Sequence, residues 1–424
     1  MNVASQIERY LPQQMLEFVG DISREANQLG QKAYLVGGVV RDLLLGYSNL
    51  DLDVVIEGDA LKLAQRIAKI RQLRLVTHPR FGTVKLSDDN FTLDIATARC
   101  ETYSNPGALP AVIYGTLSDD LFRRDFSINA MAISLVPSNY GELIDPYQGR
   151  NDIERRYIRI LHPESFSDDA TRILRAIRYE QRLGFELELQ TSQMLKQAIP
   201  MLDAISGDRI RHELELILKE KHPESALGRL GELGALQKIN VALRGNGWIT
   251  EKFSKARLLS KSDQLPSLYL CLFIYSLSQR ENGQFIHRLN VPAKLTRALR
   301  DTLQLKSRLH LLCKASVKHS EIYYLLREYD PLAVQANAIA SESSSARSNL
   351  ELFLTKLRHV KTLLNGDSLK KLGFSAGLEL GEILQVLHKA KLDGEVKTVK
   401  EEKELALSMK PQHKSKRRKA PKVN

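Results

Sequence analysis

Apolar residues in the first part of the chain follow two different periods. Residues 5–29 carry them at helical spacing, which predicts an amphipathic helix whose stripe is formed by Ile7, Leu11, Met15, Phe18 and Ile22. Alternating or β-branched runs at 33–36, 50–57, 73–78, 82–86 and 91–99 predict strands, and helical patterns lie between them at 39–46 and 60–72. This succession predicts an α/β unit with a small mixed sheet over residues 1–145.

The pattern changes after residues 143–153, "LIDPYQGRNDI". From about residue 167 onward almost every segment has helical spacing, as in "DDATRILRAIRYEQRL" and "GDRIRHELELILK". We therefore expect an α/β head over 1–145 and an all-helical remainder, which we divide into 146–240 and 241–407. Residues 408–424, which are polar and basic, are expected to be disordered.

The basic excess is concentrated at the end of the chain. The 424 residues carry a formal net charge of +12, and seven positive charges lie in the last fifteen residues, "KPQHKSKRRKAPKVN", which contain no acid. An excess of this kind fits a polyanionic partner, most simply a nucleic acid. For the terminal segment alone, a purely solubilising role is an equally good interpretation.

Cysteine usage and hydropathy favour a reducing, aqueous compartment. Cys100, Cys271 and Cys313 form no C-x-x-C pair, and their odd number gives no disulfide framework. The first ten residues lack the apolar core of a signal peptide, and the longest apolar stretch, 265–278, is too short to span a bilayer and predicts a buried helix. We therefore expect a cytoplasmic protein without a membrane partner, and the sequence indicates neither a protein partner nor an oligomeric state.

Two acidic residues stand two positions apart in the predicted strand 50–57. Asp51 and Asp53 project to the same face, where unpaired carboxylates repel each other. Mg²⁺ would relieve this repulsion, because it takes one or two carboxylates together with substrate phosphates. Asp94 adds a third acid on a later strand, and three such acids can hold two metal ions ~3.5–4 Å apart. An isolated D-x-D is more often a solvated strand end, so the neighbouring residues decide.

A diglycine turn precedes these acids. Gly37 and Gly38 have no side chains, so a triphosphate can approach the backbone of the turn. The helix expected from Val39 points its N–H groups and its positive dipole end at the same place, and Arg41 adds a guanidinium fork. The glycines and Arg41 would seat phosphates and the aspartates would seat metal ions, while Asp42 would pair with a neighbouring basic group.

A helix predicted over residues 169–178 has one apolar and one charged arc. At 3.6 residues per turn, the apolar arc gathers Ala170, Ile173, Leu174 and Ile177. The opposite arc carries Asp169, Arg172, Arg175 and Arg178. Taken alone, this is an ordinary amphipathic helix with an Asp–Arg pair three residues apart.

Four stretches, in order, resemble the class II tRNA nucleotidyltransferase and poly(A) polymerase family, in the superfamily that also holds DNA polymerase beta. They are "GGVVRDLLLGYSNLDLD" (37–53), "DDLFRRDFSINAMA" (119–132), "DDATRILRAIRYEQRLGF" (168–185) and "GDRIRHELELIL" (207–218). The third departs from the family pattern at Asp168, where Glu is usual, and at Tyr179, where Phe is common. Four motifs in register over about 33–220 are specific, whereas the likeness beyond about 240 is only a general helical character.

The resemblance implies a fold and a set of roles. The head would be a polymerase-beta-type palm, followed by a helical neck, body and tail that contact the acceptor arm and 3′ end of tRNA. Arg124 would contact the incoming nucleotide, with Asp125 and Asn129 near its sugar and the local scaffold. Asp169 and Arg172 would act as a protein template, and Arg175 and Arg178 would help to hold the nucleotide.

The template role has a physical basis. Cytosine and adenine both present an amino donor beside a ring-nitrogen acceptor, so a carboxylate can accept from the first and a guanidinium can donate to the second. Uracil and guanine present a carbonyl and an N–H, and a pocket of buried polar groups rejects that mismatch. One pocket of this kind would admit CTP and ATP without a nucleic-acid template.

We therefore expect a Mg²⁺-dependent nucleotidyltransferase that adds C, C and A to the 3′ end of tRNA. The chain has no His-Asp dipeptide, which argues against an appended phosphohydrolase of the HD type. The loop 101–118 has about the full family length, which the resemblance associates with complete CCA or A addition. An A-adding or CC-adding enzyme, a poly(A) polymerase and a catalytically silent RNA-binding protein stay open as alternatives.

Overall fold

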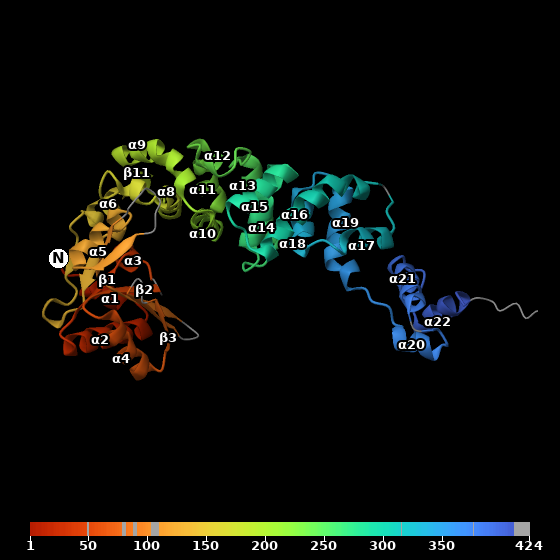
Figure 1. Cartoon of the computed structure of the whole chain (residues 1–424), viewed down its shortest axis with the longest axis horizontal. Coiled ribbons are helices and arrows are strands. Elements are labelled where there is room, and N and C mark those ends of the chain that lie inside the picture. The colour runs from red at the N-terminus through yellow and green to blue at the C-terminus, as the bar shows by residue number, and fades with distance from the viewer. Residues whose placement is uncertain are drawn as a thin grey trace, which may run out of the picture. The chain divides into compact units, whose positions relative to one another are not determined.

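The computed structural model describes residues 1–48, 51–78, 82–87, 91–102, 110–314, 316–375 and 377–410. The chain divides into two compact units (Figure 1). Unit 1 comprises Met1–Thr250 with His287–Asn290, and unit 2 comprises Glu251–Ile286 and Val291–Asn424. This division falls near the predicted boundary at 240, but the boundaries at 145 and 240 stay predictions. Most of the predicted basic tail, 411–424, lies outside the described residues.

A seven-stranded mixed sheet forms the centre of the head in unit 1. Its order is β3-β4-β5-β2-β1-β8-β9, and only the β2–β5 pair is parallel. The strands are β1 Lys32–Val36, β2 Asp51–Glu57, β3 Arg74–His78, β4 Thr83–Ser87, β5 Thr92–Thr97, β8 Ala132–Ser134 and β9 Leu143–Ile144. The predicted α/β head with a mixed sheet is therefore confirmed.

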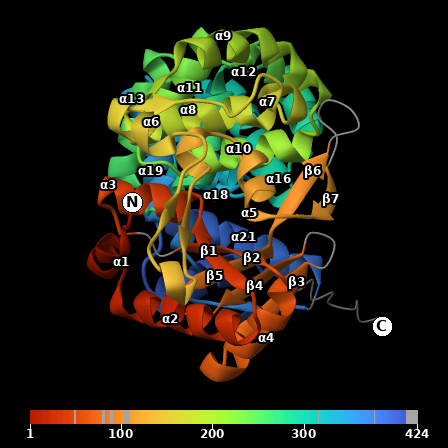
Figure 2. The same ribbon diagram turned by 90° about the vertical axis from the view of Figure 1, so that its left-hand side faces the viewer.

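Helices cover one face of this sheet. Helices α2 (Gln13–Gln28) and α4 (Ala60–Arg71) lie side by side against it (Figure 2), joined by the ion pair of Arg71 with Asp21, 2.6 Å. Asp59 caps α4 as predicted, because its carboxylate accepts from the Lys62 N–H. Helix α3 spans Gly38–Leu45, and Gly46 caps its C-terminal end, also as predicted.

Two local predictions were wrong. The single helix expected over 5–29 is two helices, α1 (Ala4–Tyr10) and α2, because a residue before proline avoids helical geometry and Leu11 precedes Pro12. The strand expected over 91–99 ends at Thr97, and a separate hairpin follows. That hairpin pairs β6 (Arg99–Thr102) with β7 (Ala111–Tyr114), so it begins at the end of the expected strand and continues into the expected loop 101–118. Residues 103–109 of this loop lie outside the described part.

The rest of unit 1 is mainly helical. A two-stranded pair, β10 (Tyr157–Ile158) with β11 (Glu186–Leu187), lies among helices. The helices are α5 Leu117–Phe122, α6 Gly149–Arg155, α7 Ser165–Asp168, α8 Thr171–Leu183, α9 Leu189–Ala198, α10 Gly207–Leu218, α11 Pro223–Glu232 and α12 Ala235–Ile239, and α13 Gly247–Leu259 runs across the division into unit 2.

Unit 2 is helical throughout its described residues. Its helices are α14 Leu265–Phe273, α15 Gln279–Arg288, α16 Ala293–Arg308, α17 His319–Leu326, α18 Pro331–Ala340, α19 Ser344–Thr355, α20 Gly366–Lys371, α21 Leu378–Leu392 and α22 Val399–Ser408. The apolar stretch 265–278 forms α14 and a short 3₁₀ turn, and its side chains are largely buried, as predicted. Within the described ranges, no helix combines the length and the apolar character needed to cross a membrane.

Candidate functional site

Three carboxylates lie at one edge of the sheet in unit 1. Asp51 and Asp53 are exposed on the same face of β2, while Leu52 between them is buried. Asp94 is the direct partner of Asp53 in the parallel β2–β5 register. The two-residue period of the strand and the parallel pairing thus bring together the acids that the sequence singled out.

These carboxylates disturb each other's titration. Removal of water by the surrounding protein raises the pKa of Asp53 to about 6, and Asp94 and Asp51 add to the rise, although Arg124 opposes it. The pKa of Asp94 is also raised, first by loss of water and then by Asp51, against the opposing charge of Lys85 at 3.8 Å. The edge therefore carries more negative charge than its own side chains neutralise.

The donor set fits a hard divalent cation that is shared with a substrate. Among the described residues, no three His, Cys, Asp or Glu side chains come close enough to hold a metal ion by themselves. Mg²⁺ commonly takes only one or two carboxylates and completes its shell with water and phosphate oxygens. Neighbouring acids with raised pKa values suit that arrangement, because a bound cation favours their ionised form.

The glycine turn faces the same edge. Gly37 has φ 73° and ψ −133°, a backbone conformation that side chains disfavour. A β-carbon at this position would lie 2.7 Å from Nη1 of Arg124 and 3.5 Å from Oδ2 of Asp53. Gly37 is thus favoured by its backbone angle and by the close approach of the Arg124 guanidinium, whereas the Asp53 carboxylate lies at ordinary contact distance.

Arg41 is placed differently from the expectation that it would face the phosphates. Its side chain is buried, with only 2% of the residue exposed, and its donors bind Asp42 at 2.8 Å and Asn129 Oδ1 at 2.7 Å. Asp42 therefore has the basic partner that was expected for it. Arg41 supports the site from inside the protein, and a direct contact with phosphate stays a prediction.

A cavity of ≈ 280 Å³ opens between the head and the first helices after it, and polar side chains dominate its wall. Of the predicted residues it is lined by Gly37, Gly38, Asp53, Arg124, Asp125, Asn129, Asp169, Arg172 and Arg175. The sequence singled out four others, Arg41, Asp51, Asp94 and Arg178, that are not part of this lining. The structure thus brings nine of the predicted residues to one cavity, next to the acidic edge.

Asp125 anchors one wall of the cavity. Its Oδ2 accepts two hydrogen bonds from Arg175, at 2.9 and 2.6 Å, and its Oδ1 accepts one from Asn129 at 3.0 Å. Burial alone would raise the pKa of Asp125, but Arg175 and Asn129 outweigh it and lower the pKa to about 2. Because Asn129 also binds Arg41, these contacts form one buried chain from the glycine turn to α8.

Asp169 does not lie on the helix that was predicted to carry it. Helix α7 ends at Asp168, Asp169 is extended with φ −145° and ψ 95°, and α8 begins at Thr171. The Asp169 carboxylate accepts from the Thr171 N–H at 2.9 Å and from its hydroxyl at 2.6 Å, and Arg209 of α10 contacts it at 2.7 Å. The predicted helix 169–178 was wrong at its start, because a carboxylate that accepts from the backbone two residues later favours a turn.

The charged arc of α8 is not a solvated face. Ile173, Leu174 and Ile177 pack inward as predicted, but Arg172 and Arg178 are buried as well. Arg178 contacts Glu220 at 3.4 Å and Glu213 at 3.6 Å, while its Nε has no partner among the described residues. An ordinary amphipathic helix would leave these guanidinium groups in water.

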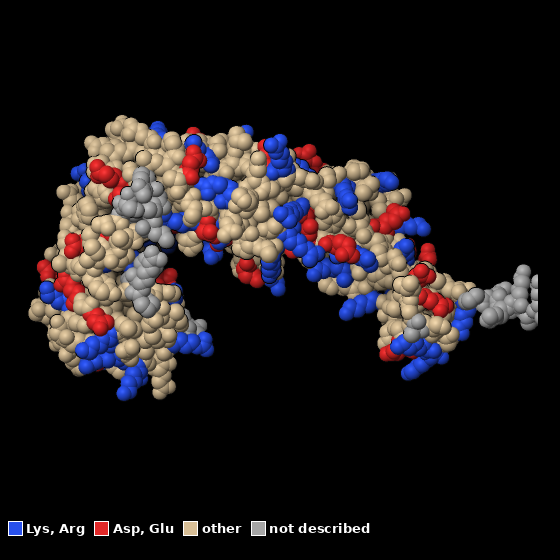
Figure 3. All heavy atoms as spheres, in the orientation of Figure 1, with Lys and Arg blue, Asp and Glu red and all other residues tan. Residues whose placement is uncertain are grey.

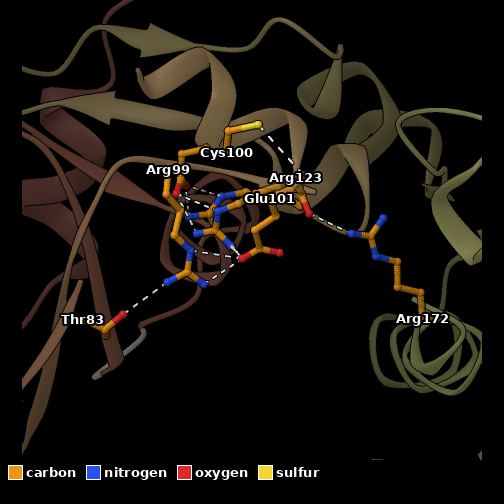
Figure 4. Close-up of polar contacts among 8 residues, drawn as sticks. Thr83, Arg99, Cys100, Glu101, Arg123 and Arg172 are labelled. Carbon is orange, nitrogen blue, oxygen red and sulfur yellow. Dashed lines mark hydrogen bonds and ion pairs between the residues drawn. The ribbon is translucent and has the colours of Figure 1, made fainter. Parts of the chain in front are cut away.

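Arg172 is held by the segment that precedes it and by the head. Its Nη1 donates to Ser165 Oγ at 2.5 Å, and its Nη2 donates to the Arg123 carbonyl at 2.8 Å. Arg123 in turn contacts Glu101 at 3.2 Å, and Arg99 contacts the same carboxylate at 2.8 Å (Figure 4). The orientation of Arg172 is therefore coupled to the base of the β6–β7 hairpin.

Three cavity residues escaped the sequence reasoning: Glu101, Arg123 and Tyr179. The Tyr179 ring lies under three guanidinium groups, those of Arg178 at 4.9 Å, Arg41 at 5.2 Å and Arg175 at 5.7 Å. Tyr179 lies four residues beyond Arg175 on α8, which was the available signal, but the sequence analysis treated it only as a departure from the family pattern. Glu101 and Arg123 carried no periodic signal.

Comparison with known proteins is consistent with this architecture. Residues 33–159 match the Poly A polymerase head domain, and residues 184–242 match a domain described as the probable RNA and SrmB-binding site of polymerase A. The chain is 34% identical to the A-adding tRNA nucleotidyltransferase of Halalkalibacterium halodurans over 88% of this chain and 87% of the relative. It is also 34% identical to the A-adding enzyme of Geobacter sulfurreducens, over 95% of this chain but 48% of that protein.

Solved structures give the same result. A CCA-adding enzyme in its apo form II superposes with a TM-score of 0.80 at 31% identity, covering 96% of this chain and 99% of the other. The Thermotoga maritima CCA-adding enzyme complexed with tRNA superposes with a TM-score of 0.74 at 31% identity, covering 96% and 98%. Related structures of CCA-adding enzyme hold ATP or CTP.

The lengths of these relatives differ. The chain spans about half the length of the curated relatives from Geobacter sulfurreducens and Aquifex aeolicus, at 48% and 44%. It covers 87% of the Halalkalibacterium halodurans relative and 99% of the CCA-adding enzyme in its apo form II, and both matches extend over both units. The chain therefore belongs to the family of tRNA nucleotidyltransferases and poly(A) polymerases.

Proposed function

We propose that this protein transfers nucleotides from CTP and ATP to the 3′ end of tRNA, with release of pyrophosphate. The observation that carries the proposal is the meeting of Asp53, the Gly37 turn and Arg124 at the mouth of a cavity lined by four arginines. A phosphate chain needs cationic donors and an open backbone, whereas its reacting end needs carboxylates that can share a metal ion. Both requirements are met at this one cavity, by residues of the head and of α8.

Mg²⁺, held by Asp51, Asp53 and Asp94 together with the phosphates, would activate the primer hydroxyl and neutralise charge at the leaving pyrophosphate. Gly37 and Gly38 would admit the triphosphate, and Arg124 would bind it beside Asp53. The primer 3′-hydroxyl would then attack the α-phosphate. Because the reaction needs little covalent chemistry from the protein, positioning and electrostatic stabilisation would supply most of the rate.

Base choice would fall to Asp169 and Arg172, as the sequence predicted. Asp169 would accept from the amino group of cytosine or adenine, and Arg172 would donate to the ring nitrogen. The assignment is supported by the contacts that fix the orientation of both side chains. Asp169 is held by Thr171 and Arg209. Arg172 is held by Ser165 and the Arg123 carbonyl. Arg175 and Arg178 would help to hold the nucleotide indirectly, Arg175 through its contact with Asp125 and Arg178 through its contact with the Tyr179 ring.

We infer that unit 2 contacts the body of the tRNA through phosphates and shape. Lys and Arg side chains are scattered over the visible face of its helices, and some of them lie at α16 and near α20 (Figure 3). Helix α16 alone contains Lys294, Arg297, Arg300, Lys306 and Arg308. Such contacts position an RNA without reading its sequence.

Relatives with different activities leave A-only addition as a second candidate. Three relatives similar along most of this chain are named A-adding enzymes, another is named CC-adding, and others are named CCA-adding. A single pocket that accepts both CTP and ATP, as argued above, favours CCA addition, whereas the names of the long-matching relatives favour addition of A alone. The two proposals differ only in whether CTP is used.

One experiment separates these activities. The protein is incubated with labelled CTP or ATP and with tRNA ending at the discriminator base, at C, or at CC. Complete CCA addition labels all three primers with the expected nucleotide, whereas an A-adding enzyme labels only the CC primer and only from ATP. A poly(A) polymerase would extend any primer with several A residues. No incorporation into any primer, from protein that binds tRNA, would overturn the proposal in favour of a silent RNA-binding protein.

A further inference from the structure

A carboxylate beneath the cavity has a role that the proposed chemistry does not assign. Asp120 of α5 is 0% exposed, yet it is acidic and lies next to the cavity arginines. A buried charge is costly unless it is paired and hydrogen-bonded. Asp120 meets that condition in an unusual way, because it serves two consecutive arginines.

The two oxygens of Asp120 are divided between these arginines. Oδ1 accepts from Nε and Nη2 of Arg123, at 2.9 and 2.6 Å. Oδ2 accepts from Nε and Nη2 of Arg124, at 3.2 and 2.9 Å. Each guanidinium is thus bound by two of its donors, which fixes its plane as well as its position.

The contact with Arg124 leaves a defined donor facing the site. Nε and Nη2 are used by Asp120, and the remaining Nη1 is the atom that would lie 2.7 Å from a β-carbon at Gly37. The Arg124 charge also lowers the pKa of Asp53, so the guanidinium lies within electrostatic reach of the acidic edge. Arg124 therefore stands between a buried acid behind it and the glycine turn in front.

The start of α5 places Asp120 for this contact. The Thr116 hydroxyl accepts from the Asp119 N–H at 3.4 Å, and the Asp119 carboxylate accepts from the Thr116 N–H at 2.8 Å, which is a capping box. Leu117 and Leu121 turn inward with Asp120 into the apolar interior. Burial acts to raise the pKa of Asp120, but Arg124 and Arg123 outweigh it and lower the pKa, so the carboxylate stays charged.

We propose that Asp120 is a positioning residue that holds Arg124 against the Gly37 turn, so that Nη1 is presented to the phosphates of the incoming nucleotide. This rests on the proposed function, and it adds a residue that touches no substrate itself. A purely structural ion pair would stabilise the fold without changing nucleotide affinity. A positioning residue changes affinity through Arg124.

The test is equilibrium binding of CTP and ATP, each with Mg²⁺, to the full chain. We compare wild type with Asp120→Asn, Arg124→Lys and the double variant, and we record thermal melts for each. The matched control is Glu180→Gln, which removes another buried carboxylate bound to an arginine, Arg229 at 3.2 Å, outside the cavity lining. Loss of hydrogen bonds to a charged group should weaken nucleotide binding by roughly ten- to a hundred-fold in Asp120→Asn.

The double variant identifies the route. If Asp120 acts through Arg124, Asp120→Asn should weaken binding by less than about twofold further once Arg124 is Lys, because Lys cannot make the two-point contact. Additive losses would contradict the proposal. So would equal affinity of Asp120→Asn and wild type, or an equal loss in Glu180→Gln.

Two further outcomes are decided in advance. If Asp120→Asn does not fold, Arg124→Lys alone decides: retention of affinity within about twofold would show that charge without orientation suffices and would overturn the proposal, whereas a loss of about tenfold in a folded variant would support it. If the wild type binds neither CTP nor ATP, the proposed function itself is wrong. If the wild type binds both and Asp120→Asn binds them equally, only the role of Asp120 is wrong.

Discussion

Two pairs of aspartates in the head are opposite in electrostatics. Asp53 and Asp94, at the edge of the sheet, have like-charged neighbours and raised pKa values. Asp120, beneath the cavity, and Asp125, in its wall, are buried, bind arginines and have lowered pKa values. The aspartates at the edge of the sheet can thus accept a further cation, whereas Asp120 and Asp125 already have arginines as their cationic partners.

The difference separates chemistry from scaffolding. A carboxylate whose charge is unfavourable in the empty protein gains most when a metal ion and a phosphate arrive. A carboxylate already paired in a buried network gains nothing from the substrate, but its removal leaves an arginine without its partner. Substitutions of the two kinds should therefore fail in different ways.

The largest expected effect is on turnover at the acidic edge. Asp53→Asn keeps the shape but removes a charge that we propose binds the metal ion, so nucleotide incorporation should fall by about a thousandfold or more while tRNA affinity barely changes. Incorporation is measured at saturating Mg²⁺, and tRNA binding is measured separately. Near-normal turnover in this variant would remove Asp53 from the metal site.

Substitution of a paired carboxylate should instead lower the stability of the folded protein. Asp125 has a folded-state pKa of about 2, below its ordinary 3.8, so it contributes stability that is fully present above pH 3.8 and is lost as the pH falls through about 2. Asp125→Asn should destabilise the protein by about 2–4 kcal/mol at pH 7, because it also leaves Arg175 partly unpaired.

This loss is measured by thermal melts of wild type and Asp125→Asn between pH 7 and pH 3. The difference in melting temperature between wild type and Asp125→Asn should narrow toward pH 3. Below pH 3.8 the wild type begins to lose the stability that the charged Asp125 carboxylate contributes. Asp53→Asn serves as the control and should show no comparable loss at pH 7. Equal melting of Asp125→Asn and wild type at pH 7 would mean that the buried chain from Arg41 to α8 contributes no stability.

A carboxylate of intermediate character should affect selectivity. Asp169 is only partly buried, bound by Thr171 and Arg209, and open to the cavity. Asp169→Asn replaces an acceptor by an amide that can also donate, so discrimination against UTP should fall by roughly ten- to a hundred-fold, with lower efficiency for CTP and ATP. The measurement is kcat/KM for the three nucleotides on matching tRNA primers, with melts alongside. Equal losses for all three, at an unchanged UTP-to-CTP ratio, would argue that Asp169 only shapes the turn before α8.

The sequence predicted the grouping of the three acids well because strand geometry places them together. A period of two puts Asp51 and Asp53 on one face, and Asp94 lies in a run that could only be a neighbouring strand. The glycine turn was also predicted from the sequence, since a diglycine that follows a short apolar run is typical of a turn after a strand. The order of the head and the helical remainder followed from the change of period near residue 153.

The cavity wall was harder because its geometry is tertiary. Asp169 was assigned to the helix, since spacing cannot distinguish a helical residue from a capping turn two residues before it. Arg41 was expected at the phosphates, but Asp42 and Asn129, which is 88 positions away, bind it inside the protein. Nothing in the local pattern marks Glu101 as a partner of Arg123, because that pairing depends on where two chain segments meet. Asp120 lies three residues before Arg123 and four before Arg124, so its spacing was a local signal that the sequence reasoning did not use.

The smallest expected effect is a shift in pH dependence, and it tests the acidic edge without a mutation. A pKa of about 6 means that Asp53 is partly protonated in mildly acidic solution, so kcat/KM should fall as the pH drops below about 6 at low Mg²⁺. Mg²⁺ competes with the proton for the same oxygens, so a higher Mg²⁺ concentration should move this acid limb to lower pH. The apparent value belongs to the coupled group of Asp53, Asp94 and Asp51 rather than to one residue. The experiment is a pH–rate profile at limiting and at saturating Mg²⁺, with tRNA binding followed at each pH as a control. An acid limb that stays fixed while Mg²⁺ changes would show that protonation and metal binding occur at different groups, and the contrast between the two pairs of aspartates would lose its chemical meaning.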